Sequence, residues 1–194
     1  MRRQFFDSAA SGWEDRNYPD EIRQKLEKLL ESVIIPVGGT ILDVGTGQGI
    51  LLPFLRKKAG FEAKLIAMDL SLPMLQCAGK KDPSVIPLLA RAEKIPLEND
   101  YVDLIVCQAA FPHFEDQKTA VKEFHRVLKK GAGAYVLHLM SSHQIKHHHS
   151  CHQAVINDVL PQREQMLEMW TEAGFGQLKL EDEPGRYFFY GQKL

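Results

Sequence analysis

The sequence predicts an α/β protein built on a doubly wound, mainly parallel seven-stranded sheet, with an antiparallel strand near the C-terminus. Short apolar runs with the composition of buried strands alternate with segments of helical period along most of the chain. The first of these runs leads through a glycine-spaced turn directly into a helix, over residues 40–55, as nucleotide-type α/β units begin. The alternation ends in two consecutive strand-like segments, which predicts a hairpin-like edge.

The N-terminal 35 residues are predicted to form an arm followed by a helix. Residues 1–18 lack a clean period, which fits a short helix or an ordered arm. Pro19 and Asp20 then mark a helix start, and apolar residues recur at three- and four-residue spacing as far as Val33. The arm carries three aromatic residues that either close over a ligand or anchor the arm to the core: Phe5, Phe6 and Trp13.

The strands of the sheet follow in order along the chain. We expect them near residues 40–43, 63–69, 85–89, 101–108, 134–140, 175–180 and 186–191. Helices are expected at 50–55, after Ser71 as a cap, at 117–128 and at 162–173. Residues 129–133 are expected to form a tight turn before the fifth strand. The fourth strand is almost wholly apolar, which is typical of a strand covered on both faces.

Composition excludes several classes of function. The chain has 194 residues, 44% hydrophobic and 25% charged, which suits a single domain spanning 1–194. No apolar run approaches the roughly 20 residues that span a membrane. A net charge of -1, with the two signs interleaved, argues against a broad nucleic-acid surface. Three widely spaced cysteines predict free thiols and a cytoplasmic protein, which we expect to be a monomer or homodimer.

The turn after the first strand has the features of a ligand-binding loop. Gly45, Gly47 and Gly49 allow the backbone to approach a ligand where a Cβ atom would block it. Asp69 ends the second strand, where an acid can accept hydrogen bonds from both ribose hydroxyls of an adenosine cofactor. Asp43, before the loop, would repel a pyrophosphate and attract a cation. The residues therefore favour a cationic adenosine cofactor over a dinucleotide.

Several ordered motifs resemble those of the class I S-adenosylmethionine-dependent methyltransferases. Asp-Val-Gly-Thr-Gly-Gln-Gly at 43–49 resembles the first motif, and Met-Asp-Leu-Ser at 68–71 is similar to the family's second-strand ending. Residues 90–105 resemble the third and fourth motifs, and 123–133 the turn before the fifth strand. The resemblance covers about residues 5–140. It implies a Rossmann-like fold, S-adenosylmethionine as cofactor and methyl transfer, which composition directs to a small-molecule substrate.

The resemblance also implies which residues contact the cofactor. These are Asp43, Gly45, Thr46, Gly47, Gly49, Asp69, Leu70, Met74, Ala92, Glu93 and Gln108. The residues up to Gly49 would hold the methionine portion and Asp69 the ribose. Those between 70 and 93 would surround the adenine, although the apolar ones would serve equally well as ordinary core. Gln108 would lie beside the methionine end. Arg91 departs from the family pattern, because many relatives carry an acid there.

Methyl transfer depends on alignment of the acceptor with the methyl group, and needs a general base only when the acceptor must lose a proton. His113 follows the fourth strand, close to the expected position of the methyl group, and is the candidate catalytic base. The alternative is a structural histidine beside the cofactor. His138 lies inside the fifth strand, where a buried histidine with its hydrogen bonds satisfied is expected.

The segment 141–160 is polar and rich in histidine, and is predicted to form a lid at the edge of the sheet that carries the reactive methyl group. If the segment is helical, several histidines and a cysteine share a face at the spacing used for metal ligands. The candidate metal ligands are His143, His147, His148, Cys151 and His152. A solvated segment and a lid that contacts substrate are the alternatives to a metal site.

Two other classes of function remain open. An NAD-dependent dehydrogenase would need to hold a pyrophosphate on the glycine loop. A non-catalytic module would bind S-adenosylmethionine or a metal and transfer nothing.

Overall fold

The structure is a computed structural model, and it describes residues 2–151 and 153–194. Its strands are β1 (Thr40–Val44), β2 (Lys64–Asp69), β3 (Ile86–Leu89), β4 (Val102–Gln108), β5 (Leu128–His138), β6 (Phe175–Glu183) and β7 (Arg186–Lys193). Its helices are α1 (Arg2–Ala9), α2 (Trp13–Asn17), α3 (Asp20–Leu30), α4 (Leu52–Ala59), α5 (Leu72–Lys81), α6 (Gln117–Val127), α7 (Ser142–Ser150) and α8 (Arg163–Glu172). A short 3₁₀ helix, η1 (Phe111–His113), follows β4.

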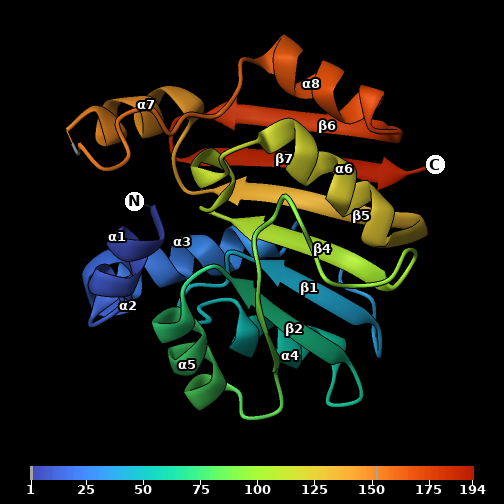
Figure 1. The fold of residues 1–194 in the computed structure, drawn as a ribbon, viewed down its shortest axis with the longest axis horizontal. Helices are drawn as coiled ribbons and strands as arrows, with labels where there is room; N and C mark the ends of the chain where they lie inside the picture. The colour runs from blue at the N-terminus through green and yellow to red at the C-terminus, as the bar shows by residue number, and fades with distance from the viewer. Residues whose placement is uncertain (1, 152) are drawn as a thin grey trace.

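The seven strands form one sheet in the order β3-β2-β1-β4-β5-β7-β6. Strands β1 to β5 pair in parallel, whereas β7 is antiparallel to both of its neighbours, β5 and β6. The predicted fold class, including the antiparallel strand near the C-terminus, is therefore confirmed. Figure 1 shows the parallel strands pointing toward the side of the molecule that carries α1, α2 and α7.

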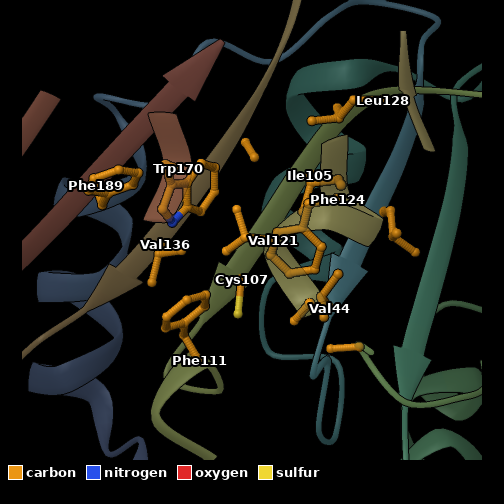
Figure 2. Close-up of a cluster of buried hydrophobic side chains, with 14 of the residues drawn as sticks. Val44, Ile105, Cys107, Phe111, Val121, Phe124, Leu128, Val136, Trp170 and Phe189 are labelled. Carbon is orange, nitrogen blue, oxygen red and sulfur yellow. The ribbon is translucent and has the colours of Figure 1, made fainter. Parts of the chain in front are cut away.

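The sheet separates two hydrophobic clusters. One lies under α6 and α8 and includes Trp170, whose ring centroid is 4.7 Å from that of Phe189 on β7. Figure 2 shows this ring beside Phe189 and Val136. The other cluster lies under α3, α4 and α5. Ile41 and Leu42 on β1 belong to opposite clusters, because successive side chains of a strand point to opposite faces. Burial on both faces explains the apolar runs in the sequence.

Side-chain caps set where the helices around the carboxyl edge begin. The hydroxyl of Ser71 accepts a hydrogen bond from the backbone N–H of Met74 at 3.4 Å, as the sequence predicts for the start of α5. At the start of α7, Ser141 and Gln144 form a capping box in which each side chain bonds to the other's backbone N–H. This box fixes the start of α7 shortly after the end of β5.

The tight turn predicted at 129–133 is wrong. The segment belongs to β5, where Leu128 pairs with Val102 but the next pair joins Gly133 to Leu104. The ladder therefore contains an irregular bulge with extra residues on the β5 side. Polar and glycine-rich composition is common to turns and to bulges at an exposed strand end, so the sequence alone did not separate them.

Within residues 2–151 and 153–194, no helix has both the length and the apolar character needed to cross a membrane. The cysteines are unpaired, as predicted: Cys77, Cys107 and Cys151. Cys107 is fully buried, and this burial raises the pKa of its thiol.

Candidate functional site

A cavity of about 540 Å³ lies at the carboxyl ends of β1, β2 and β4. This is the position at which open α/β sheets bind ligands. The predicted cofactor-binding residues that line it are Gly45, Thr46, Gly47, Asp69, Leu70, Met74, Ala92, Glu93 and Gln108. The candidate base His113 lines the same cavity. Residues predicted from five separate stretches of sequence thus meet around one space.

The three glycines of the loop have different structural roles, although all have positive φ. A Cβ on Gly45 would lie 2.2 Å from the Cβ of Ala110, so this glycine allows the loop after β4 to approach. A Cβ on Gly49 would lie 3.1 Å from the Cβ of Ala78, so this glycine allows α5 to pack and does not line the cavity. A Cβ on Gly47 would meet nothing within 4 Å. Gly47 therefore leaves open space at the cavity wall.

Asp69 braces the loop while facing the cavity. Its Oδ2 accepts a hydrogen bond from the backbone N–H of Gly47 at 2.9 Å, and its Oδ1 accepts one from that of Ser71 at 2.9 Å. Burial raises the pKa of this carboxyl, and the backbone hydrogen bonds oppose the rise. An ionised carboxylate has about four lone-pair positions, more than these two backbone N–H groups occupy, so it can also accept from hydroxyl donors in the cavity.

Asp43 does not line the cavity, in contrast to the direct contact predicted for it. The side chain is only 2% exposed and lies beneath the loop, where its Oδ2 accepts a hydrogen bond from the Thr46 hydroxyl at 2.7 Å. Burial raises the pKa of Asp43 to about 7; the Thr46 hydrogen bond lowers it and the charge of Asp69 raises it further. Asp43 therefore supports the loop through Thr46 and acts on the cavity from behind it.

Glu93 connects the segment after β3 to the segment after η1. One carboxylate oxygen accepts hydrogen bonds from the backbone N–H groups of Glu115 and Asp116 at 2.7 and 3.2 Å. The other lies 3.4 Å from Nε of Arg91. Arg91, which departs from the family pattern, thus forms an ion pair at the rim of the cavity. Glu93 holds the cavity wall in addition to bordering the space itself.

The N-terminal arm closes one side of the cavity, and sequence analysis anticipated this only in part. Phe6 and Trp13 line the cavity, as the first of the two alternatives for the arm requires, whereas Phe5 does not. The side chain of Gln48 joins loop and arm: its Oε1 accepts from the backbone N–H of Glu14 at 2.7 Å, and its Nε2 donates to the carbonyl of Ala10 at 2.8 Å. A glutamine inside a glycine motif carries no pattern that would reveal such a clamp.

Gln48→Ala is expected to release the arm without unfolding the sheet. The substitution removes two hydrogen bonds that together contribute about 1–2 kcal/mol, so the open arm should become about 5–30 times more populated. Trypsin cleavage after Arg16, followed by mass spectrometry, should accelerate by this factor. The control is Gln192→Ala, which removes a glutamine hydrogen bond to the Gly131 carbonyl far from the arm. Equal cleavage rates in the two variants would contradict the clamp.

His113 and Asp158 form a pair at the cavity that sequence analysis identified only by its histidine. Nδ1 of His113 lies 2.7 Å from Oδ2 of Asp158, whose side chain is 2% exposed. His149 packs against His113 with ring centroids 5.0 Å apart, and its Nδ1 lies 2.5 Å from the Asp158 carbonyl. Asp158 lies 45 residues beyond His113 in an irregular segment, so neither period nor motif connects them.

His138 departs from its expected state. The residue is buried, as predicted, but its Nδ1 has no hydrogen-bond partner among the described residues. Burial, with additional repulsion from His113, His149 and His148, lowers the pKa of His138 to about 3. The ring is therefore neutral at pH 7. A strand position can be read from the sequence, whereas the partners of a buried ring cannot.

The candidate metal ligands do not form a metal site in the part of the chain that the structure describes. No group of three or more histidine, cysteine or acidic side chains there is arranged to hold an ion. The segment is helical, as the hypothesis required, but His143, His147, His148 and Cys151 are exposed. His152, the last member of the set, lies outside the described residues.

His138→Leu is expected to make stability less sensitive to acid. The folded pKa of about 3 lies below the unfolded value of about 6.5, so the unfolded state binds more protons between these values. Stability from this group is complete above about pH 6.5 and falls by up to ~1.4 kcal/mol per unit as pH falls. Between pH 7 and 5 the variant should lose about 2 kcal/mol less than the parent, measured by urea unfolding.

Comparing the parent protein with His138→Leu also removes the contribution of Asp43 to the pH dependence of stability. Asp43, whose folded pKa is about 7, gives the opposite pH dependence below neutrality, and it is present in both chains. Parallel stability curves for the parent and His138→Leu would contradict the neutral buried ring.

Comparison with known proteins identifies the family. A model described as a methyltransferase domain matches residues 42–136. The chain is 39% identical over 117 residues to a demethylmenaquinone methyltransferase of Chlorobaculum tepidum, covering 60% of this chain and 46% of that one. It is 31% identical over 164 residues to an uncharacterized methyltransferase of Schizosaccharomyces pombe, covering 83% of this chain and 64% of that one. The chain thus spans less than two thirds of the length of either relative.

The fold is also similar to that of solved methyltransferase structures. A Thermotoga maritima S-adenosylmethionine-dependent methyltransferase, described as a possible histamine N-methyltransferase, superposes with a TM-score of 0.82 at 18% identity over the whole of both chains. At this identity the likeness speaks for the fold alone. Together with the matched domain and the relatives, it agrees with the family that the ordered motifs resemble. The chain belongs to the class I S-adenosylmethionine-dependent methyltransferase family.

Proposed function

We propose that the protein binds S-adenosylmethionine in the cavity at the carboxyl edge and transfers its methyl group to a small-molecule acceptor. The observation that carries this proposal is the meeting of the open Gly47 position with the Asp69 carboxylate on one cavity wall. A backbone that can be approached closely, next to a paired acceptor for ribose hydroxyls, is what an adenosine cofactor requires. The cavity volume of about 540 Å³ lies within the range of about 300–1,000 Å³ for small-ligand sites.

The residue roles in this proposal follow the cavity wall. Asp69 would hold the ribose, with Leu70, Met74 and the 92–93 segment around the adenine. The Gly45–Gly47 loop and Gln108 would face the methionine portion, and Tyr18 would orient Gln108 because its hydroxyl donates to the Gln108 Oε1 at 3.0 Å. When bound, the cofactor would supply an activated methyl group. The chain would supply alignment, which is the main source of acceleration in such a displacement.

The acceptor is inferred to be a small molecule because the arm closes the cavity. Phe6 and Trp13 line it opposite the glycine loop, and Gln48 holds the arm in place. A folded macromolecule would have to displace this cover.

We also infer one domain over 1–194, a lid role for 141–160, a monomer or homodimer, and a cytoplasmic location without nucleic-acid or membrane partners. The unpaired thiols support that location.

Calorimetry with S-adenosylhomocysteine and with NAD tests the proposal. Binding of S-adenosylhomocysteine at least 100 times tighter than NAD is expected, because a pyrophosphate on the glycine loop would lie beside the Asp69 carboxylate, which faces the cavity. Tighter binding of NAD would overturn the proposal in favour of a dehydrogenase. Release of S-adenosylhomocysteine over an acceptor panel then tests catalysis, and binding without release for any acceptor would favour a non-catalytic module.

A further inference from the structure

We infer that His113 and Asp158 form an acid–base pair that takes the proton from a hydroxyl acceptor during methyl transfer. The inference rests on the proposed function and deepens it by naming the substrate class, an alcohol or phenol. A neutral amine attacks with its own lone pair, whereas a neutral hydroxyl is a weak nucleophile near pH 7 and gains most from a general base.

The hydrogen bond between the two side chains determines which ring nitrogen faces the cavity with a lone pair. An ionised carboxylate can only accept, so Nδ1 of His113 must donate to Oδ2 of Asp158 over the 2.7 Å that separates them. In the neutral ring the lone pair is then on Nε2. No hydrogen-bond partner of Nε2 was found among the described residues, and His113 lines the cavity. This arrangement is the one that a histidine base oriented by an acid requires.

Asp158 is held in position by its own backbone. Its side chain is 2% exposed, its N–H donates to the Val155 carbonyl at 2.8 Å, and its carbonyl accepts from Nδ1 of His149. A carbonyl cannot donate, so His149 must carry its proton on Nδ1. Asp158 is thus a positioning residue fixed from two sides. On the cavity side, the Phe6 ring packs on His113 at a centroid distance of 5.3 Å and restrains the imidazole further.

His113 lies in a cluster of titratable side chains. The titratable groups that face it within the cluster are Asp158, His138, His148 and His149. Burial lowers the pKa of His138 to about 3 and also lowers that of His149, so both rings stay neutral near pH 7. Within this cluster, Nδ1 of His113 lies 2.7 Å from Oδ2 of the Asp158 carboxylate. The other ionisable side chains of the cavity wall are Arg3, Glu14, Tyr18, Asp69, Arg91, Glu93 and Glu115.

The proposed step balances without a further reactant. When bound, S-adenosylmethionine supplies the methyl carbon, and the carbon–sulfur bond breaks with its electron pair remaining on sulfur. A lone pair of the acceptor oxygen forms the new bond to that carbon, and the oxygen's proton passes to Nε2 of His113. The imidazolium that results is paired with the Asp158 carboxylate until its proton leaves to water. General bases of this kind contribute about 10²- to 10⁴-fold.

Nitrogen-15 NMR of the protein without cofactor tests the pair independently of activity. The neutral ring of His113 should carry its proton on Nδ1. Asp158→Asn should move the proton to Nε2, because an asparagine amide can donate to Nδ1, and Asp158→Glu, which keeps the carboxylate, should retain it on Nδ1. His147→Gln, an exposed histidine of the same segment, is the control and should leave the His113 signals unchanged. A proton on Nε2 in the parent protein would overturn the inference.

The kinetic arm uses acceptors in matched pairs on one skeleton, beginning with para-hydroxybenzoate and para-aminobenzoate. For the hydroxyl members, His113→Gln and Asp158→Asn should lower kcat by about 100-fold or more with KM changed little, and His147→Gln should not. Undiminished kcat in folded His113→Gln would overturn the inference. A different result would contradict the proposed function: a parent protein that does not bind S-adenosylhomocysteine. The NMR measurement does not depend on that binding, so the two failures can be distinguished.

Discussion

Asp69→Asn is expected to weaken S-adenosylhomocysteine binding by about 30-fold or more. Asp69 faces the cavity with two oxygens that each already accept one backbone hydrogen bond, and the ribose hydroxyls would use the remaining lone pairs. Hydrogen bonds to a charged group contribute about 1.5–3 kcal/mol each, so losing the charge and one acceptor costs at least about 2 kcal/mol of binding. Isothermal titration calorimetry measures the change directly.

A matched control for this prediction exists elsewhere in the chain. Asp82 also accepts from the backbone N–H two residues ahead, that of Ser84, at 2.9 Å, as Asp69 does from Ser71. Asp82 lies outside the cavity and pairs with Arg56. Asp82→Asn therefore reproduces the local change without touching the site, and should bind the ligand as the parent does. Similar affinities for the two variants would show that the ribose is not held by Asp69.

The parts of the fold that the sequence predicts are those fixed by local physics. Burial on both faces makes the central strands apolar, and Ser71 caps α5 because a hydroxyl at a helix start satisfies a free N–H group. The bulge in β5 was missed because glycine and lysine suit a turn and an exposed strand end equally well. Pairing with β4, a non-local contact, determines that this segment forms part of the strand and not a turn.

The same distinction between local and non-local contacts separates the site residues that could be predicted from those that could not. The glycine loop and Asp69 could be predicted because they lie within one βαβ unit, where spacing along the chain determines spacing in the structure. Asp158 could not, because its contact with His113 joins an irregular segment to a 3₁₀ helix across 45 residues. For Asp43, the sequence predicted an acid beside the loop but not how deeply it is buried. An acid beneath the loop and an acid in the cavity wall would occupy the same position in the motif, so the sequence does not distinguish them.

Gly45→Ala is expected to lower the free energy of unfolding by about 2–5 kcal/mol. The residue has φ of 71°, a conformation that costs an L-residue roughly 1–2 kcal/mol. The new Cβ would also lie 2.2 Å from the Cβ of Ala110, which has no flexible end to move aside, and overpacking of this kind costs about 1–3 kcal/mol. Urea unfolding checks the value, and a loss below about 1 kcal/mol would mean that the two loops are not in this close contact.

Gly47→Ala separates the binding role of the loop from its folding role. Gly47 has φ of 55° and a Cβ there would meet nothing within 4 Å, so the loss of stability should be only the roughly 1–2 kcal/mol of the backbone conformation.

Gly131 has φ of 78° with equally open surroundings away from the cavity, so Gly131→Ala should lose a similar amount. Only Gly47→Ala places a methyl group at the wall that faces the ligand, and its affinity for S-adenosylhomocysteine should fall about 10-fold or more while Gly131→Ala binds normally. Equal affinities would mean that the cofactor does not approach this backbone, whereas the expected split would assign Gly45 to the fold and Gly47 to the ligand within one motif.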